Sequence, residues 1–94
     1  MTASELAFSC LLLKQPKGFT ALCLDVDVAS EGATPAKAKQ LLGEAVELYL
    51  DSAIENNLPY LRPVPREDDP RVLTPASVLK TFRLKVNLRV SAVA

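Results

Sequence analysis

The sequence predicts an α+β fold in which a small antiparallel sheet carries one long helix on one of its faces. Three patterns indicate this fold: two apolar runs joined by a turn within residues 5–24, a helical spacing of apolar residues over 35–55, and alternation of apolar and polar residues over 82–91. A chain of 94 residues has the size of one compact domain. We therefore expect a single domain over residues 1–94, with the order strand, strand, strand, helix, connector, strand.

The first two strands are expected to form a hairpin. Residues 5–14 are mostly apolar and lead into Gln15-Pro16-Lys17-Gly18, whose proline and glycine suit a tight turn. Residues 19–24 form the second apolar run. A four-residue turn places Cys10 opposite Cys23, and we expect both thiols to be small, reduced core residues rather than a disulfide.

A short third strand and the long helix follow. The third strand is predicted over 26–31 and ends at Gly32. Thr34-Pro35 starts the helix, because threonine accepts a hydrogen bond at the N-cap and proline suits the first helical position. Asn56-Asn57 and Pro59 end it. The apolar residues of the helix recur every three or four positions and predict one buried stripe: Ala38, Leu41, Leu42, Ala45, Val46, Tyr49 and Ala53.

The C-terminal part contains a proline-rich connector and a long strand. Residues 58–75 hold five of the seven prolines and the acidic run Glu67-Asp68-Asp69, so we expect an extended, solvated segment. Thr74-Pro75 is expected to start one helical turn that reaches Leu79. The last strand is predicted from alternation with a period of two. Its apolar positions are Phe82, Leu84, Val86, Leu88 and Val90.

The composition argues against several classes of function. Histidine is absent, which removes the commonest general base and metal ligand, and the two cysteines lack the spacing of a metal site. The 11 basic residues equal the 11 acidic ones, which disfavours a dedicated nucleic-acid binder. The apolar run near the N-terminus is too short to span a membrane and lacks the features of a secretory signal. We therefore expect a cytoplasmic, non-enzymatic protein without a membrane segment or cofactor.

The charges are unevenly distributed between the two parts of the chain. Residues 1–57 contain four basic and eight acidic side chains, whereas residues 58–94 contain seven basic and three acidic ones. Such opposite charges either pair within the chain or attract another copy or a different partner.

The acidic pair Asp25 and Asp27 lies between the second and third strands. With Glu31 nearby, these carboxylates are weak candidates for a Mg²⁺ site; the alternative is a polar loop between two strands.

Arg83, Lys85 and Arg89 line the polar face of the last strand. Such a basic face contacts RNA phosphates or an acidic protein; the alternative is a solvated face that discourages uncontrolled pairing of the strand edge.

Three motifs in the first part of the chain resemble those of HicB-type antitoxins. Gly18-Phe19-Thr20-Ala21 resembles the family's G-[FY]-x-A, and Ala29-Ser30-Glu31-Gly32-Ala33-Thr34 resembles x-[SC]-x-G-x-T. Glu44-Ala45-Val46-Glu47-Leu48-Tyr49-Leu50 resembles E-A-[LVI]-E-L-[YW]-L. The likeness extends over residues 5–58. It implies a partial RNase H-like fold, β-β-β-α-β, an antiparallel meander with the strand after the helix beside the first.

The resemblance also implies a function. HicB-type antitoxins bind and neutralise HicA-type toxins, which are small mRNA-cleaving proteins, and their partial RNase H-like domain has no nuclease activity. Many members carry an additional DNA-binding domain. This chain ends at Ala94, directly after its last strand, so we do not expect autonomous DNA binding. Leu24-Asp25-Val26-Asp27-Val28 replaces the family's frequent Pro-Asp-Leu-Pro-Gly, which is expected to alter the toxin-facing surface.

The first hypothesis is therefore a HicB-like antitoxin domain that masks a basic HicA-type toxin. The last strand is expected to lie at a sheet edge and to pair with its copy in a dimer or tetramer. The alternatives are a small RNA-binding module that uses the basic strand face, and a metal-dependent nuclease that uses the acidic pair. In the first hypothesis, the acidic residues expected to face the partner are Asp25, Asp27, Glu31, Glu44, Glu47 and Asp51.

Overall fold

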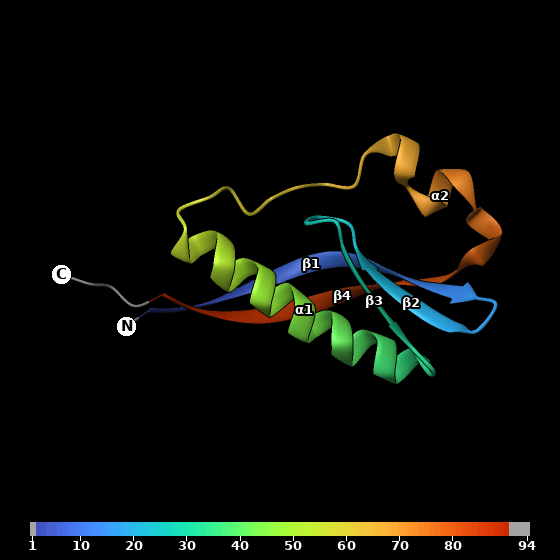
Figure 1. The fold of residues 1–94 in the computed structure, drawn as a ribbon, viewed down its shortest axis with the longest axis horizontal. Helices are drawn as coiled ribbons and strands as arrows, with labels where there is room; N and C mark the ends of the chain where they lie inside the picture. Colours follow the sequence, from blue (N-terminus) through green and yellow to red (C-terminus); the bar gives the residue numbers. More distant parts are fainter. Residues whose placement is uncertain (1, 91–94) are drawn as a thin grey trace.

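Four strands form one antiparallel sheet, and a long helix packs on one of its faces (Figure 1). The computed structural model describes the backbone of residues 2–90 and the side chains of residues 6–86. The order of the strands in the sheet is β3-β2-β1-β4, so the last strand lies beside the first. The predicted α+β class and element order are confirmed. The main elements are β1 (Thr2–Gln15), β2 (Gly18–Cys23), β3 (Val28–Gly32), α1 (Pro35–Glu55) and β4 (Val78–Val90).

The hairpin of β1 and β2 has the predicted register. Lys14 pairs with Phe19, and Cys10 pairs with Cys23. Gly18 has a φ of 129°, a conformation that favours glycine. Both cysteines are buried and free. A side-chain hydrogen bond with Cys23, and then burial, raise the pKa of the Cys10 thiol, which keeps it protonated as a core residue.

Helix α1 begins and ends at the predicted capping residues. The Thr34 hydroxyl accepts a hydrogen bond from the backbone N–H of Lys37 at 3.1 Å, and Pro35 takes the first helical position. Asn56 is the C-cap, and Asn57 follows with a φ of 55°, which asparagine tolerates better than most residues. Neither α1 nor any other helix of the described residues is long and apolar enough to cross a membrane. The residues that α1 buries are Ala38, Leu42, Val46, Leu50 and Ala53.

The core lies between α1 and the inner face of the sheet. The helix buries Leu42, Val46 and Leu50 completely, and they pack in one cluster with Phe8 of β1 and Val86 of β4. The chain turns sharply from β3 into α1 at Gly32. A Cβ atom at this position would lie 2.5 Å from the backbone nitrogen of Ala38, so the close approach requires glycine.

The turn between β2 and β3 is longer than predicted. Residues 24–27 form it, and β3 begins at Val28 instead of residue 26. Val26 is fully buried inside this turn. Its apolar character therefore reflects packing into the core and not membership of a strand.

The connector between α1 and β4 starts as an extended segment that is bound to this turn. The backbone N–H of Arg62 donates to the carbonyl of Asp25, and that of Val64 donates to the carbonyl of Leu24, both at 2.9 Å. Three short helical turns follow: η1 (Arg66–Asp68), α2 (Pro70–Leu73) and η2 (Pro75–Ser77). The turn expected at Thr74-Pro75 is thus a 3₁₀ turn that ends before β4 begins.

The acidic run in the connector is only partly solvated. Glu67 and Asp68 are exposed, but Asp69 is buried and caps α2. The Asp69 carboxylate accepts hydrogen bonds from the backbone N–H of Arg71 at 2.9 Å and from its guanidinium at 2.7 Å. These hydrogen bonds hold the pKa of Asp69 below its ordinary value. The expectation of a wholly solvated run was wrong at Asp69.

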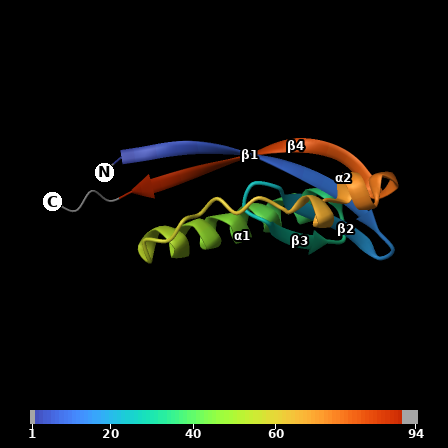
Figure 2. The same ribbon diagram turned by 90° about the horizontal axis from the view of Figure 1, so that it is seen from above.

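Strand β4 lies at the edge of the sheet and pairs with β1 along its whole length. The pairing runs from Thr2 and Val90 to Leu13 and Val78, whereas β2 pairs only with Cys10–Gln15, so β1 and β4 extend beyond the other strands as a two-stranded ribbon (Figure 2). The predicted alternation is confirmed over 82–86: Phe82, Leu84 and Val86 face the core, whereas Arg83 and Lys85 are exposed. The side chains of Leu88, Arg89 and Val90 lie outside the described residues.

Candidate protein-binding surfaces

The six acidic residues predicted to face a partner lie in three separate places. β3 separates two of these places, because Val28 pairs with Cys23 at the turn after β2, whereas Gly32 pairs with Phe19 at the hairpin end. Asp25 and Asp27 lie in the turn, Glu31 lies near the hairpin end of β3, and Glu44, Glu47 and Asp51 lie on α1. The structure therefore does not bring the six together into one surface.

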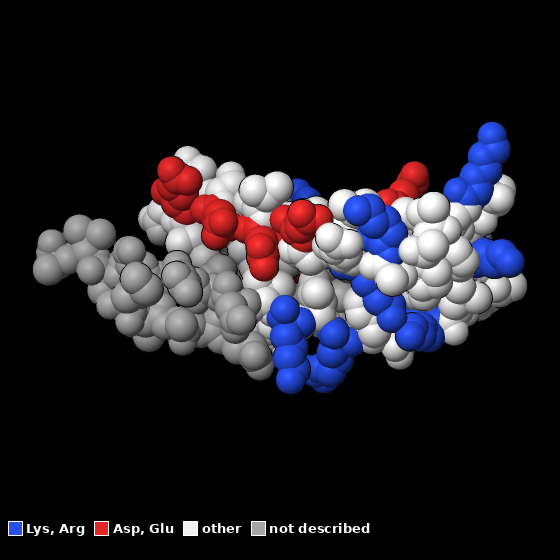
Figure 3. Space-filling view, turned by 90° about the horizontal axis from the view of Figure 1, so that it is seen from below, with Lys and Arg blue, Asp and Glu red and all other residues white. Residues whose placement is uncertain are grey.

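The exposed side of α1 carries a continuous acidic row, which we define as Glu44, Glu47, Asp51 and Glu55. All four side chains are exposed, and their spacing of three and four residues places them on one side of the helix. Figure 3 shows acidic side chains gathered in a row on this face of the molecule. Leu48 lies among them with 71% of its surface exposed, the largest value of any large apolar side chain in the described part of the chain.

The charges of α1 oppose its dipole. A helix favours acidic residues in its first turn and basic residues in its last turn. The first turn of α1 contains Lys37 and no acidic residue, and the last turn contains Glu55 and no basic residue. In addition, Asp51 lies four residues from both Glu47 and Glu55, a spacing at which like charges repel. The acidic row therefore destabilises the isolated helix.

Asp25 has a structural role. Its carboxylate accepts a hydrogen bond from the backbone N–H of Ser9 at 2.7 Å, and the carbonyl of Ser9 accepts one from the N–H of Leu24 at 2.9 Å. The Asp25 carbonyl also binds the connector through Arg62. Asp25 thus fixes the turn to both β1 and the connector, as in the polar-loop interpretation.

Asp27 is exposed in the same turn, with a φ of 52°. This left-handed conformation is one that aspartate adopts more readily than most residues. Among the side chains that the structure describes, no group of three or more cysteines and carboxylates is placed to hold a metal ion.

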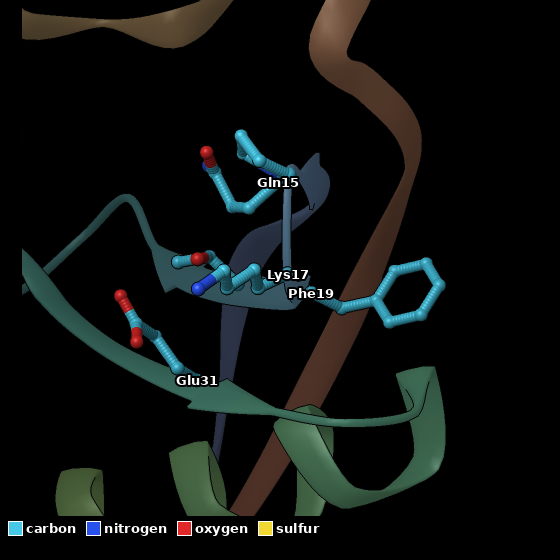
Figure 4. A pocket seen from close by; sticks show the side chains of 6 residues that line it. Gln15, Lys17, Phe19 and Glu31 are labelled. Atoms are coloured by element: carbon cyan, nitrogen blue, oxygen red, sulfur yellow. The ribbon is translucent and has the colours of Figure 1, made fainter.

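Glu31 borders an open hollow of about 570 Å³ at the tip of the hairpin. Figure 4 shows the side chains of Gln15, Lys17 and Glu31 on one side of the hollow, whereas Phe19 points away from them. The basic Lys17 therefore shares this region with Glu31. Unlike the side of α1, the hollow is not uniformly acidic.

Basic side chains gather around β4. Arg83 and Lys85 are exposed on its outer face, and the Nζ atom of Lys39 lies 5.0 Å from the centroid of the Phe82 ring. The pKa of Lys39 is lowered by its side-chain contact with Lys80, by burial and by repulsion from that second ammonium group. Figure 3 shows basic side chains next to the acidic row, with little mixing of the two.

The residues that the sequence predicts to face a partner do not include Leu48 or Glu55. Leu48 falls outside the apolar stripe of the helix, although it is apolar. Its position four residues after Glu44 and three before Asp51 is the signal that identifies it as an exposed leucine on the acidic side. Glu55 continues the same spacing.

Comparison with known proteins gives a likeness in structure. None of the family models and none of the curated proteins compared with the chain matches it. Among solved structures, a chain of the "HicA3 and HicB3 toxin-antitoxin complex" is similar, with a TM-score of 0.57 and 20% sequence identity over 86% of this chain and 95% of that chain. At this identity the likeness establishes the fold alone. The protein thus has a fold that occurs in a toxin–antitoxin complex, which agrees with the fold implied by the HicB-like motifs.

Proposed function

We propose that this protein is a HicB-like antitoxin that binds and neutralises a small HicA-type RNA-cleaving toxin through protein–protein contact. The observation that supports this proposal most strongly is the fold shared with a chain of the HicA3–HicB3 complex. The name of that complex includes both the toxin and the antitoxin, so a second observation is needed to choose between the two roles. The acidic row favours the antitoxin role, because a protein that binds RNA phosphates needs a basic surface and its inhibitor needs the complementary charge.

The proposed mechanism is occupation of the toxin's RNA-binding surface. The four carboxylates of the acidic row attract the lysines and arginines that otherwise bind phosphate groups. A bound antitoxin then excludes RNA both by repelling its phosphates and by covering the surface. No chemical step on this chain is required, and its lack of histidine is consistent with such a non-enzymatic role.

The proposal includes self-association through β4. This strand has 13 residues, lies at the edge of the sheet and has β1 as its neighbour on one side. A long edge strand presents backbone N–H and C=O groups on its open side, which pair readily with another strand. Antiparallel pairing with the same strand of a second copy would join the two sheets about a two-fold axis.

Affinity capture of the tagged protein from its native cytoplasm tests this proposal. We expect a small basic protein to be recovered at near-equal stoichiometry. Light scattering of the purified tagged protein alone tests self-association, and we expect two or four times the mass of one chain. A variant with Glu47→Lys and Asp51→Lys should lose the basic protein and keep its own assembly. Equal recovery of the basic protein by the parent and by the variant would contradict a role for the acidic row. Recovery of only copies of the chain would contradict the antitoxin role.

RNA binding by the chain itself is the second candidate. The exposed Arg83 and Lys85 on the outer face of β4 favour it. This function requires that a short RNA binds the purified protein without a toxin, with an affinity that falls steeply as salt is raised.

A further inference from the structure

We infer that the acidic side of α1 docks a basic, amphipathic protein segment and that Leu48 provides the apolar anchor for it. The inference rests on the proposed function for the class of the partner. It adds the surface that this chain uses and the feature of the partner that it recognises, which is a segment with both basic and apolar residues. The docking face consists of the acidic row, Leu48 and an apolar hollow beside them.

Leu48 connects the charged and the apolar parts of this face. It has Glu44 four residues before it and Asp51 three residues after it on the same side of the helix. Ser52 follows Leu48 by one helical turn and lines an open hollow of about 440 Å³ at the end of α1. Leu58 and Leu61 also line this hollow, and they are 59% and 61% exposed. Exposed apolar surface is thus concentrated next to the acidic row.

The hollow is held by fixed contacts. The Tyr49 hydroxyl donates a hydrogen bond to the carbonyl of Tyr60 at 2.9 Å, and the Arg62 guanidinium lies 5.4 Å from the centroid of the Tyr49 ring. These contacts bind the connector to α1. They lie beyond Leu48 as seen from the acidic row. An apolar side chain of a partner would therefore enter a site whose walls are already in place, which lowers the entropic cost of binding.

The charges of α1 indicate that the partner is basic. Glu55 lies in the last turn of the helix, where the dipole disfavours acidic residues, and the members of the row repel one another. Lysines or arginines of the partner bound to the row would relieve both effects. Apolar side chains of the partner would remove the exposed surface of Leu48 from water. Local rules of stability are often broken where a surface serves a function.

The same features disfavour the other possible occupants. RNA phosphates are repelled by four carboxylates, and a second copy that presented the same row would be repelled as well. A partner held by charge alone would not contact Leu48. A protein segment with basic residues around an apolar one fits both parts of the docking face.

Titration of the full-length protein with two synthetic helical peptides tests the inference. One peptide carries lysines on one side with leucines between them; the other has the same length and charge, with serine in place of leucine. We expect the leucine peptide to shift the amide NMR signals of α1, and Leu48→Ser to weaken its binding about tenfold, equivalent to about 1.4 kcal/mol. Leu73→Ser is the matched control, because Leu73 is 57% exposed on α2, and it should leave the affinity unchanged.

A second variant separates binding from folding. Asp51→Asn removes the repulsion of Asp51 by the carboxylates of Glu47 and Glu55, so it should raise the melting temperature and weaken binding of both peptides. Equal affinities of Leu48→Ser and Leu73→Ser, or peptide-induced shifts confined to β4, would overturn the inference. If the peptides bind as expected but no toxin is captured, the proposed function fails and the docking face stands. If a toxin is captured equally well by the Leu48→Ser variant, only the inference fails.

Discussion

Deletion of residues 82–90 should abolish folding, and the shortened chain should be unfolded or should aggregate. β4 supplies the pairing partner for β1 along most of that strand, and it contributes the buried Val86 and the half-buried Phe82 and Leu84 to the core. Without β4, Phe8 on β1 would lose apolar contacts in the core, and the backbone N–H and C=O groups at the edge of β1 would be unpaired. The expected loss is the whole free energy of unfolding, about 5–15 kcal/mol for a domain of this kind.

Circular dichroism and size-exclusion chromatography measure this effect. The deletion variant should lack a cooperative melting transition and should elute as aggregate or as an expanded chain. The substitution Arg83→Ser is the control, because Arg83 lies on the exposed face of the same strand, and it should fold as the parent does. A soluble, folded monomer from the deletion variant would contradict both the role of β4 in the fold and its role in self-association.

The substitution Leu42→Ala should destabilise the protein severely. Leu42 is fully buried on the core side of α1, and removal of such a side chain costs about 2–5 kcal/mol, because apolar contacts are lost and a cavity remains. At about 4–8 °C per kcal/mol for a domain of this size, the melting temperature should fall by roughly 10 °C or more.

Leu48→Ala is the matched control for this prediction. It makes the same chemical change on the same helix at a side chain that is 71% exposed, so the free energy of unfolding should change by no more than about 0.5 kcal/mol. Urea denaturation of the two variants compares them directly. Similar losses of stability would show that the assignment of the inner and outer sides of α1 is wrong.

The hairpin and the helix were predictable because local residues determine them. Pro16 and Gly18 set the turn and thereby the register that pairs Cys10 with Cys23. Thr34 and Asn56 mark the ends of α1 through contacts within the helix itself. In such segments the residues that fix the geometry lie within a few positions of one another.

The turn after β2 was not predictable from local patterns. Its shape depends on the hydrogen bond between Ser9 and Asp25 and on the contact of Arg62 with the Asp25 carbonyl, and these residues are distant in sequence. The same reason explains why only some of the acidic candidates lie on one surface. The carboxylates of α1 share a surface because helical spacing places them together, whereas Asp25 and Glu31 were grouped with them by charge alone.

The central claim, neutralisation of an RNA-cleaving toxin, is tested most directly by an RNA-cleavage assay with the basic protein recovered by capture. Increasing amounts of this chain should suppress cleavage of a labelled mRNA completely near one equivalent, and the Glu47→Lys, Asp51→Lys variant should require a large excess. The chain alone should leave the RNA intact in the presence of Mg²⁺. Cleavage that continues at saturating amounts of the chain, or cleavage by the chain itself, would contradict the account.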